Sequence, residues 1–362
     1  MPERPGSVHH ETVKRTLNGE EPLNACQSHV TSAVRRDRRL LVAFVVGVLG
    51  GVRTTMLLRG KTYPADFEQV WFAARALLKG HDPYALIGPG RAFPFDFQFH
   101  YPLTAAVVAI PVTPFSADVA CGVFLGLGLA ALAWALMHHG HAPLIGLVSA
   151  AAGSAIDSTQ WSPILAAAIA IPPLGVFFVA KPTIGLAMFA ARPSRWAILG
   201  GLAVAVVAFL VRPSWAGEWR EAVADQRGMT ILIRHPGGIF ALLALFRWRR
   251  PEARMLAVLA CVPMTPALYE TVPLLLIPRR WWEAAFLVLA SYGVLGWAMR
   301  TPLSLATYGV VMTNSANAIA LVLIPLATVI VLRRPNEGRV PEWLEQRLAA
   351  WPAWLRGARA RV

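Results

Sequence analysis

The chain has 362 residues, of which 56% are hydrophobic and 15% charged, and its formal net charge is +14. Soluble domains carry about a quarter charged residues, so this composition excludes an ordinary soluble protein and indicates a polytopic membrane protein. The arginines cluster at the ends of apolar runs, as the positive-inside rule predicts, so nucleic acid is not expected as a partner. The three cysteines show no metal-ligand spacing, so neither a disulfide framework nor a zinc site is indicated.

The N-terminal sequence is typical of a tail followed by an uncleaved signal anchor. Residues 1–39 hold many charges, and we expect them to form a disordered cytoplasmic tail. A transmembrane domain is expected over residues 40–333, because long runs nearly free of charge approach the roughly 20 residues that cross a bilayer. The clearest runs are 40–58, 119–137, 197–211, 282–299 and 308–332. The sequence therefore predicts an all-α, multi-pass protein of the cell membrane with about ten to twelve transmembrane helices, broken in places by 28 prolines and 28 glycines.

The first loop, residues 59–102, is expected on the extracytoplasmic face if the arginines before the first span are cytoplasmic. Its part from 63 to 102 is the long polar passage of this apolar chain, so we expect the active site here. Asp66 lies just after the first span. A carboxylate with apolar neighbours can act as a general base with a raised pKa. Alternatively, Asp66 is the N-terminal cap of a helix that begins there.

Three more residues of this loop are candidate substrate-binding groups. Tyr84 follows a turn and has a ring that can stack on a sugar. Tyr101 can contact a ligand, although tyrosine at this depth often serves as an interfacial anchor. His100, beside it, is a candidate contact for a phosphate.

Later segments add ionisable and polar groups inside apolar runs. Lys181 is a lone cation next to Pro182, and a cation in such surroundings is a functional candidate, or else a residue that snorkels from a helix end. Asp157, Gln160 and Glu270 are similarly isolated, and each can serve instead as a polar contact between helices.

A second outer loop is expected over residues 212–236. Its Arg234 and His235 are candidate contacts for an anionic head group, although loop arginines are usually only solvated. Residues 334–362 are expected to form a cytoplasmic tail with an interfacial amphipathic helix, because tryptophans and leucines recur there at helical spacing between arginines.

Several short motifs, in their order along the chain, resemble those of a known protein family. After Asp66 come residues 71–84, WFAARALLKGHDPY, then residues 99–103, FHYPL, residues 159–162, TQWS, and residues 180–182, AKP. Over residues 40–330 this pattern resembles glycosyltransferase family 87, whose members use polyprenyl-phosphate sugars. Leu103, Thr159 and Ser162 stand where that family has proline, glycine and asparagine.

The resemblance implies a C-type membrane glycosyltransferase fold with a long first extracytoplasmic loop. It implies a lipid-linked donor, polyprenyl-phosphate mannose, and a glycolipid or lipoglycan acceptor, reached among membrane lipids. Asp66 would be the general base of an inverting transfer, without a cofactor and without a required metal. Arabinofuranosyl transfer from an equivalent donor is a variant, and a lipid or sugar transporter or an inactive membrane scaffold are alternatives of another class.

Overall fold

A computed structural model describes residues 20–61, 64–224 and 228–338. The chain divides into two units, residues 1–42 and 43–362. The α-helices are α2 (Glu20–Arg59), α3 (Asp66–Leu78), α4 (Pro83–Leu86), α5 (Leu103–Ala109), α6 (Ala117–Leu136), α7 (Ala150–Asp157), α8 (Ser162–Ala167), α9 (Pro182–Ala191), α10 (Gly201–Val211), α11 (Trp215–Ala224), α12 (Pro251–Cys261), α13 (Trp281–Ala298), α14 (Tyr308–Ala318) and α15 (Ile324–Leu332).

Tighter and wider helical turns fill much of the remaining chain. The 3₁₀ segments are η1 (Ile110–Val112), η2 (Met137–His139), η3 (Ala142–Val148), η4 (Pro172–Ala180), η6 (Leu232–Arg234), η7 (Gly238–Arg247) and η8 (Leu268–Leu276), and the π-helical turns are η5 (Trp196–Gly200) and η9 (Ile319–Leu323). Two short strands, β1 (Thr230–Ile231) and β2 (Pro263–Met264), pair antiparallel. The described protein is thus predominantly helical, as expected.

Three helical segments are long and apolar enough to cross a membrane: Asp37–Arg59, Ala117–Leu136 and Tyr308–Leu332. The bent pair Trp196–Val211 and Trp215–Ala224 raises this number to at most four among the described residues. The first of these spans exposes large apolar side chains such as Phe44, Leu49 and Met56, as a lipid-facing helix does. These segments indicate a membrane protein.

The number of such helices falls below the ten to twelve expected. Helix α13 covers nearly all of the predicted run 282–299, but it is not among the segments that qualify as spans. Between α6 and α13 the apolar chain is divided into short helices and 3₁₀ segments. Prolines stand at the start of several of them, at Pro143, Pro163, Pro172 and Pro182. A proline lacks the N–H that would continue a preceding helix, so these runs are interrupted.

The predicted tails need one correction. The N-terminal tail was expected to be disordered through residue 39, whereas α2 already begins at Glu20. Pro22 lies in the first turn of α2, where the missing N–H of a proline breaks no helical hydrogen bond. Residues 1–19 and the predicted amphipathic helix after residue 340 lie outside the described residues.

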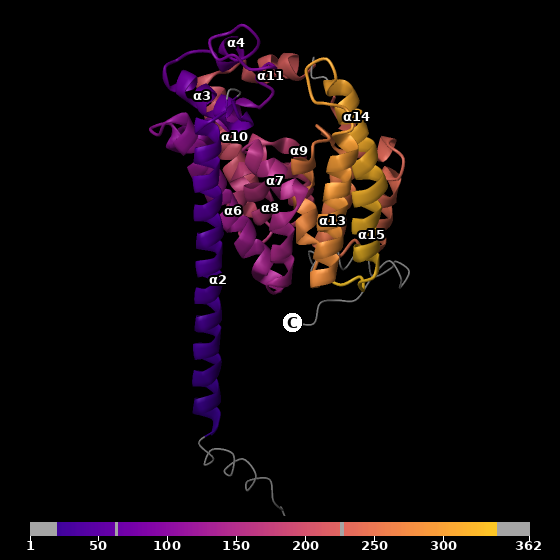
Figure 1. Ribbon diagram of the computed structural model, residues 1–362. Helices are drawn as coiled ribbons and strands as arrows, with labels where there is room; N and C mark the ends of the chain where they lie inside the picture. The colour runs from indigo at the N-terminus through magenta and orange to yellow at the C-terminus, as the bar shows by residue number, and fades with distance from the viewer. Residues whose placement is uncertain (1–19, 62–63, 225–227, 339–362) are drawn as a thin grey trace, which may run out of the picture. The chain divides into compact units, whose positions relative to one another are not determined.

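Helices α3, α4 and α11 gather at one end of the second unit, and α13, α14 and α15 lie side by side (Figure 1). The two polar loops contact each other at that end. Arg212 binds Asp82 of the first loop at 2.7 Å, and the Trp219 indole N–H donates to the carbonyl of His100 at 2.8 Å. The two loops predicted to share a face are therefore in direct contact.

Candidate functional site

Asp66 is the first residue of α3, and its side chain is not the helix cap. The preceding residue, Ala65, occupies the cap position, and its N–H donates to the carboxylate of Glu68. The N–H of Asp66 donates to the carbonyl of Ser158 at 3.1 Å, which ties the start of α3 to the end of α7. The capping interpretation of Asp66 is therefore wrong. Glu68 satisfies the cap, and the Asp66 carboxylate is available for other contacts.

Gln160 reaches Asp66 from the end of α7. The Gln160 side-chain amide N–H donates to the Asp66 carboxylate. Its backbone N–H donates to the carbonyl of Ala155 at 2.9 Å, and that of Thr159 to Ile156 at 3.2 Å. This bonding pattern ends a helix in a residue of left-handed conformation, usually glycine, and here Thr159 takes that position with φ 49°. The turn points Gln160 back at Asp66.

Lys181 joins the same cluster from the N-terminus of α9. Its ammonium group donates to the side-chain carbonyl of Gln160 at 2.8 Å and lies 2.6 Å from a carboxylate oxygen of Glu270. It also lies 4.7 Å from the centre of the Tyr269 ring, a cation–π distance. Lys181 is thus paired inside the protein and does not snorkel to a helix end.

Tyr101 completes the cluster. Its hydroxyl is hydrogen-bonded to the Gln160 side chain. Burial, with the nearby charges of Asp66 and Glu270, raises the pKa of Tyr101 well above its ordinary value, so the phenol stays protonated. Tyr101 therefore presents a neutral O–H near the Asp66 carboxylate.

The cluster has a buried layer and an accessible layer. Gln160 and Glu270 are each 1% exposed, whereas Asp66, Tyr101 and Lys181 remain partly exposed. One carboxylate oxygen of Glu270 is buried and has no hydrogen-bond partner. An ammonium group has three N–H donors, and the contacts with Gln160 and Glu270 use two of those of Lys181, so one remains for a ligand.

An aromatic wall fixes the position of Asp66. The ring of Phe67, the next residue, stacks on Phe124 with centroids 3.8 Å apart, and both rings pack edge-on against Trp161. Trp161 in turn follows Gln160 directly, so the same packing holds both polar side chains. Such rigid support is what a preorganised site requires.

Burial raises the pKa of Asp66 above its ordinary value. The positive charge of Lys181 and the hydrogen bond from Gln160 act in the opposite direction, and the charge of Glu270 raises the pKa further. A carboxylate whose pKa is raised toward neutral pH is suited to accept a proton from a hydroxyl group. The remaining N–H donor of Lys181 belongs to the same cluster.

Tyr84 and His100 lie near the cluster but do not enter it. The Tyr84 ring is buried against Phe99, and its hydroxyl donates to the carbonyl of Tyr101 at 3.1 Å, so Tyr84 positions Tyr101 instead of stacking on a sugar. Burial lowers the pKa of His100 to about 4. Its ring is therefore neutral at neutral pH and brings no positive charge to a phosphate.

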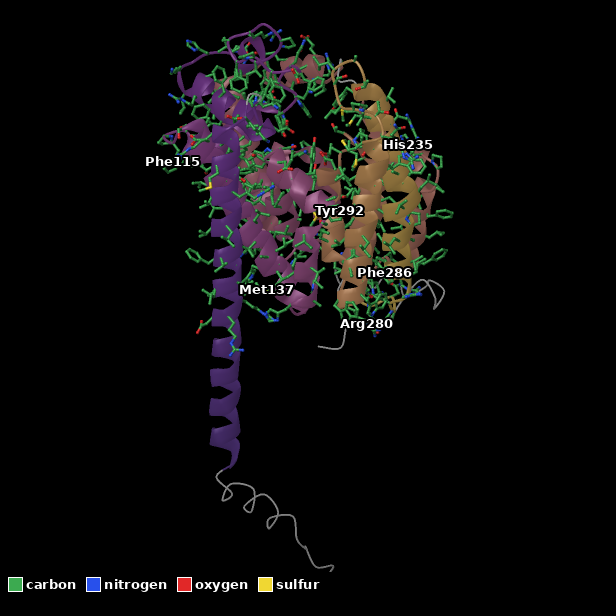
Figure 2. The ribbon with its side chains drawn as sticks, viewed as in Figure 1. Phe115, Met137, His235, Arg280, Phe286 and Tyr292 are labelled. Atoms are coloured by element: carbon green, nitrogen blue, oxygen red, sulfur yellow. The ribbon has the colours of Figure 1, made fainter. Side chains whose placement is uncertain are left out.

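Arg234 and His235 belong to a different set of contacts. His235 is hydrogen-bonded to Thr230 and Asn317, each at 2.8 Å, and Arg234 is exposed. Figure 2 shows His235 beside the chain near α14, toward the end opposite Arg280. The described contacts of the Asp66 cluster include neither residue, so their predicted role in binding the substrate has no support from the geometry.

The sequence singled out Glu270 only as an isolated acid or a contact between helices, without pairing it with Lys181, and it did not single out Tyr269. The signal available was charge: a lone lysine in an apolar run requires a buried acid, and Asp157 and Glu270 were the two isolated acids in comparable runs. The structure shows that Glu270 is the partner of Lys181. Asp157 instead pairs with Arg53. Among the described residues, no group of three or more His, Cys, Asp or Glu side chains is arranged to hold a metal ion.

Searches against protein-family models, curated proteins and solved structures found no match to this chain.

Proposed function

We propose that this chain is a membrane glycosyltransferase that moves mannose from polyprenyl-phosphate mannose to a hydroxyl group of a glycolipid or lipoglycan. The observation that carries the proposal is the meeting of Asp66, Gln160 and Lys181 in one hydrogen-bonded cluster. These residues come from three separate segments of the family resemblance. Transfer of a sugar to a hydroxyl group needs a base, a hydrogen-bond donor beside that base, and side chains that the substrate can reach. The cluster offers all three.

Asp66 is the general base of this reaction. Its carboxylate accepts the proton of the acceptor hydroxyl as that oxygen forms a bond to the anomeric carbon. The bond between the anomeric carbon and the phosphate oxygen breaks, and polyprenyl phosphate leaves with the electron pair. Attack opposite the leaving group inverts the anomeric centre.

The neighbours of Asp66 have supporting roles. Gln160 orients the carboxylate, and Glu270 holds Lys181 next to it. The remaining N–H of Lys181 and the O–H of Tyr101 are donors for the sugar or for the departing phosphate. The distribution of arginines supports an extracytoplasmic position for the cluster. The cluster lies at one end of α9 and η8, and several arginines lie at the other end, which is the cytoplasmic end by the positive-inside rule.

Replacing Asp66 with Asn tests the base directly. The variant keeps the size of the side chain but replaces one carboxylate oxygen with an amide NH2 group and cannot accept the proton, so we expect the transfer rate to fall by about 10²- to 10⁴-fold. The assay is the incorporation of radiolabelled mannose from polyprenyl-phosphate mannose into membrane glycolipid, with a parallel arm that uses the arabinofuranose donor.

Asp157→Asn is the matched control. Asp157 ends α7 close to the site, but its side chain is 56% exposed and pairs with Arg53 outside the cluster. This variant should transfer at the wild-type rate. An Asp66→Asn variant as active as wild type would rule out Asp66 as the base. If the wild-type protein transferred neither sugar, the enzyme proposal would give way to a transporter or scaffold.

A further inference from the structure

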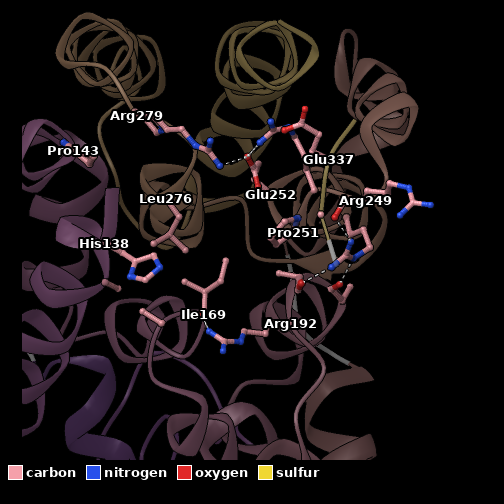
Figure 3. A pocket seen from close by; sticks show the side chains of 18 of the residues that line it. His138, Pro143, Ile169, Arg192, Arg249, Pro251, Glu252, Leu276, Arg279 and Glu337 are labelled. Carbon is pink, nitrogen blue, oxygen red and sulfur yellow. Dashed lines mark hydrogen bonds and ion pairs between the residues drawn. The ribbon is translucent and has the colours of Figure 1, made fainter. Parts of the chain in front are cut away.

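A second candidate site lies in a cavity of about 860 Å³, away from Asp66 (Figure 3). The cavity is formed where α6, α9 and η8 end and where α12 begins. Helix α9 starts after Lys181 in the Asp66 cluster and ends at Ala191 in the cavity wall, and ten helical residues span about 15 Å. On η8, likewise, Glu270 lies in the Asp66 cluster and Leu276 lies in the cavity wall. The two sites are therefore at opposite ends of these elements.

The walls of this cavity carry a marked excess of positive charge. Five arginines and two glutamates line it, which is an excess of three positive charges. The arginines are Arg192, Arg249, Arg250, Arg254 and Arg279. A cavity with this charge attracts an anion.

Two of these arginines serve the fold. Arg254 donates to the carbonyls of Ala190 and Ala191 at 2.8 and 2.7 Å, which satisfies the last turn of α9. Arg250 donates to the carbonyl of Pro335 at 2.6 Å and to Glu252 at 3.2 Å. Replacement of either residue would disturb the structure around the cavity.

Arg192 and Arg279 are less committed. Arg192 is exposed, and its described bond is one donation to the carbonyl of Ile169 at 2.5 Å. Arg279 is 42% exposed, and its nearest contact with Glu252 is 3.7 Å, longer than a hydrogen bond, because Arg250 and Arg334 each bind that carboxylate at 3.2 Å. Figure 3 shows both side chains, with His138, around the same hollow.

The rest of the lining is largely apolar and includes Leu136, Pro143, Ile169, Leu276 and Pro278. A ligand for this cavity therefore combines an anionic group with an apolar part. Arginine binds phosphate oxygens in pairs, and basic pockets between the helices of membrane proteins accept anionic lipid head groups. We propose that the cavity binds the phosphate head group of an anionic phospholipid, with its acyl chains along the apolar wall.

The test uses the purified full-length protein in detergent. Its thermal unfolding midpoint is followed against increasing dioctanoyl phosphatidylglycerol, because a ligand that binds the folded state raises that midpoint. Parallel titrations use zwitterionic dioctanoyl phosphatidylcholine and glycerol 3-phosphate. We expect the anionic lipid to raise the midpoint at concentrations where the other two have no effect.

The double variant Arg192→Gln with Arg279→Gln locates the site. We expect it to need about tenfold more phosphatidylglycerol for the same shift, since two charge-assisted contacts are lost. Arg195→Gln, an exposed arginine outside the lining, is the control and should titrate like the wild type. An unchanged titration of the double variant would overturn the proposal.

Two results need no variant. Binding of phosphatidylglycerol to the wild type should weaken as salt is raised, because salt screens the arginines, whereas purely apolar insertion would not weaken. If glycerol 3-phosphate stabilised the protein as well as the lipid did, the ligand would be a soluble phosphate compound and the lipid assignment would fail.

Discussion

The ionisation of Asp66 is set by a balance between burial and its polar and charged neighbours, chiefly Lys181, Gln160 and Glu270. Burial favours the protonated acid, whereas the ammonium group of Lys181 and the amide N–H of Gln160 favour the carboxylate. Glu270 pairs with Lys181 and so limits how strongly that lysine can stabilise Asp66. The result is an acid with a raised pKa whose side chain is held in place by its hydrogen bond with Gln160.

This balance predicts the pH dependence of transfer. A general base must be deprotonated, so the rate falls as the pH drops through the pKa of Asp66, and this acid limb lies above the ordinary range of an aspartate. Gln160→Leu removes a donor that lowers this pKa, so the limb should move to higher pH. Transfer rates measured over a buffer series from about pH 4 to pH 9 would show this shift of the acid limb. Gln98→Leu, in the first loop and outside the cluster, should leave the limb in place, and an unmoved limb in Gln160→Leu would contradict the assigned role.

Thr159 carries the backbone strain of the site. A β-branched residue in the left-handed region costs about 1–2 kcal/mol, and the Thr159 hydroxyl is buried without a hydrogen-bond partner. The family that the sequence resembles has glycine at this position, and glycine adopts a φ of 49° without strain.

Thr159→Gly should therefore keep the transfer activity and unfold at the same temperature or a higher one. Relief of strain outweighs or balances the roughly 0.5–1 kcal/mol that glycine costs in chain entropy. Thr313→Gly, within helix α14, is the control and should lower the unfolding midpoint, because glycine there relieves no strain. Equal destabilisation of both variants would show that the turn does not strain Thr159.

Small residues bring α2 and α6 into close contact within the second unit. Gly47 and Gly51 on α2 face Gly122 and Gly126 on α6, and both pairs have the four-residue spacing of close helix packing in membranes. A Cβ atom at Gly126 would lie 2.8 Å from the carbonyl oxygen of Gly47, nearer than real Cβ atoms approach. The packing of these helices therefore depends on the absence of side chains.

Gly126→Ala is expected to lower the free energy of unfolding by about 1–3 kcal/mol, because the backbones must move apart. Gly293→Ala in α13 is the matched control, since a Cβ atom there meets nothing within 4 Å. That variant should be neutral or slightly more stable. Thermal unfolding in detergent compares the two, and equal midpoints would argue against the close contact between α2 and α6.

The second unit as a whole joins segments that are far apart in the sequence. Arg212 binds Glu218 through two hydrogen bonds, at 2.6 and 2.7 Å, and also binds Asp82 of the first loop. The two polar loops thus form one layer next to the Asp66 cluster, and the arginine-rich cavity lies at the other end of α9. The proposed catalytic and lipid-binding sites are therefore separated.

Arg212→Gln should loosen the first loop although the substitution lies in the second. An ion-paired network of one arginine with two acids is worth more than an isolated exposed pair, so its loss should be measurable. We expect faster amide hydrogen exchange over residues 82–101. Arg220→Gln, which replaces an exposed arginine on helix α11, just after Arg212, should leave that exchange unchanged. Unchanged exchange in Arg212→Gln would show that the loops hold their positions independently.

The sequence alone indicates the membrane class and the long spans near 40–58, 119–137 and 308–332, and it singles out Asp66, Gln160 and Lys181 as candidate site residues. These features are local: an apolar run has a length and a charge that can be read directly, and an isolated ionisable group stands out from its neighbours. Folding in three dimensions was needed to pair Lys181 with Glu270, to exclude Arg234 and His235 from the cluster, and to form the arginine cavity. Such contacts join residues that lie far apart in the chain. Proline breaks and side-chain packing set their positions, and no local pattern encodes them.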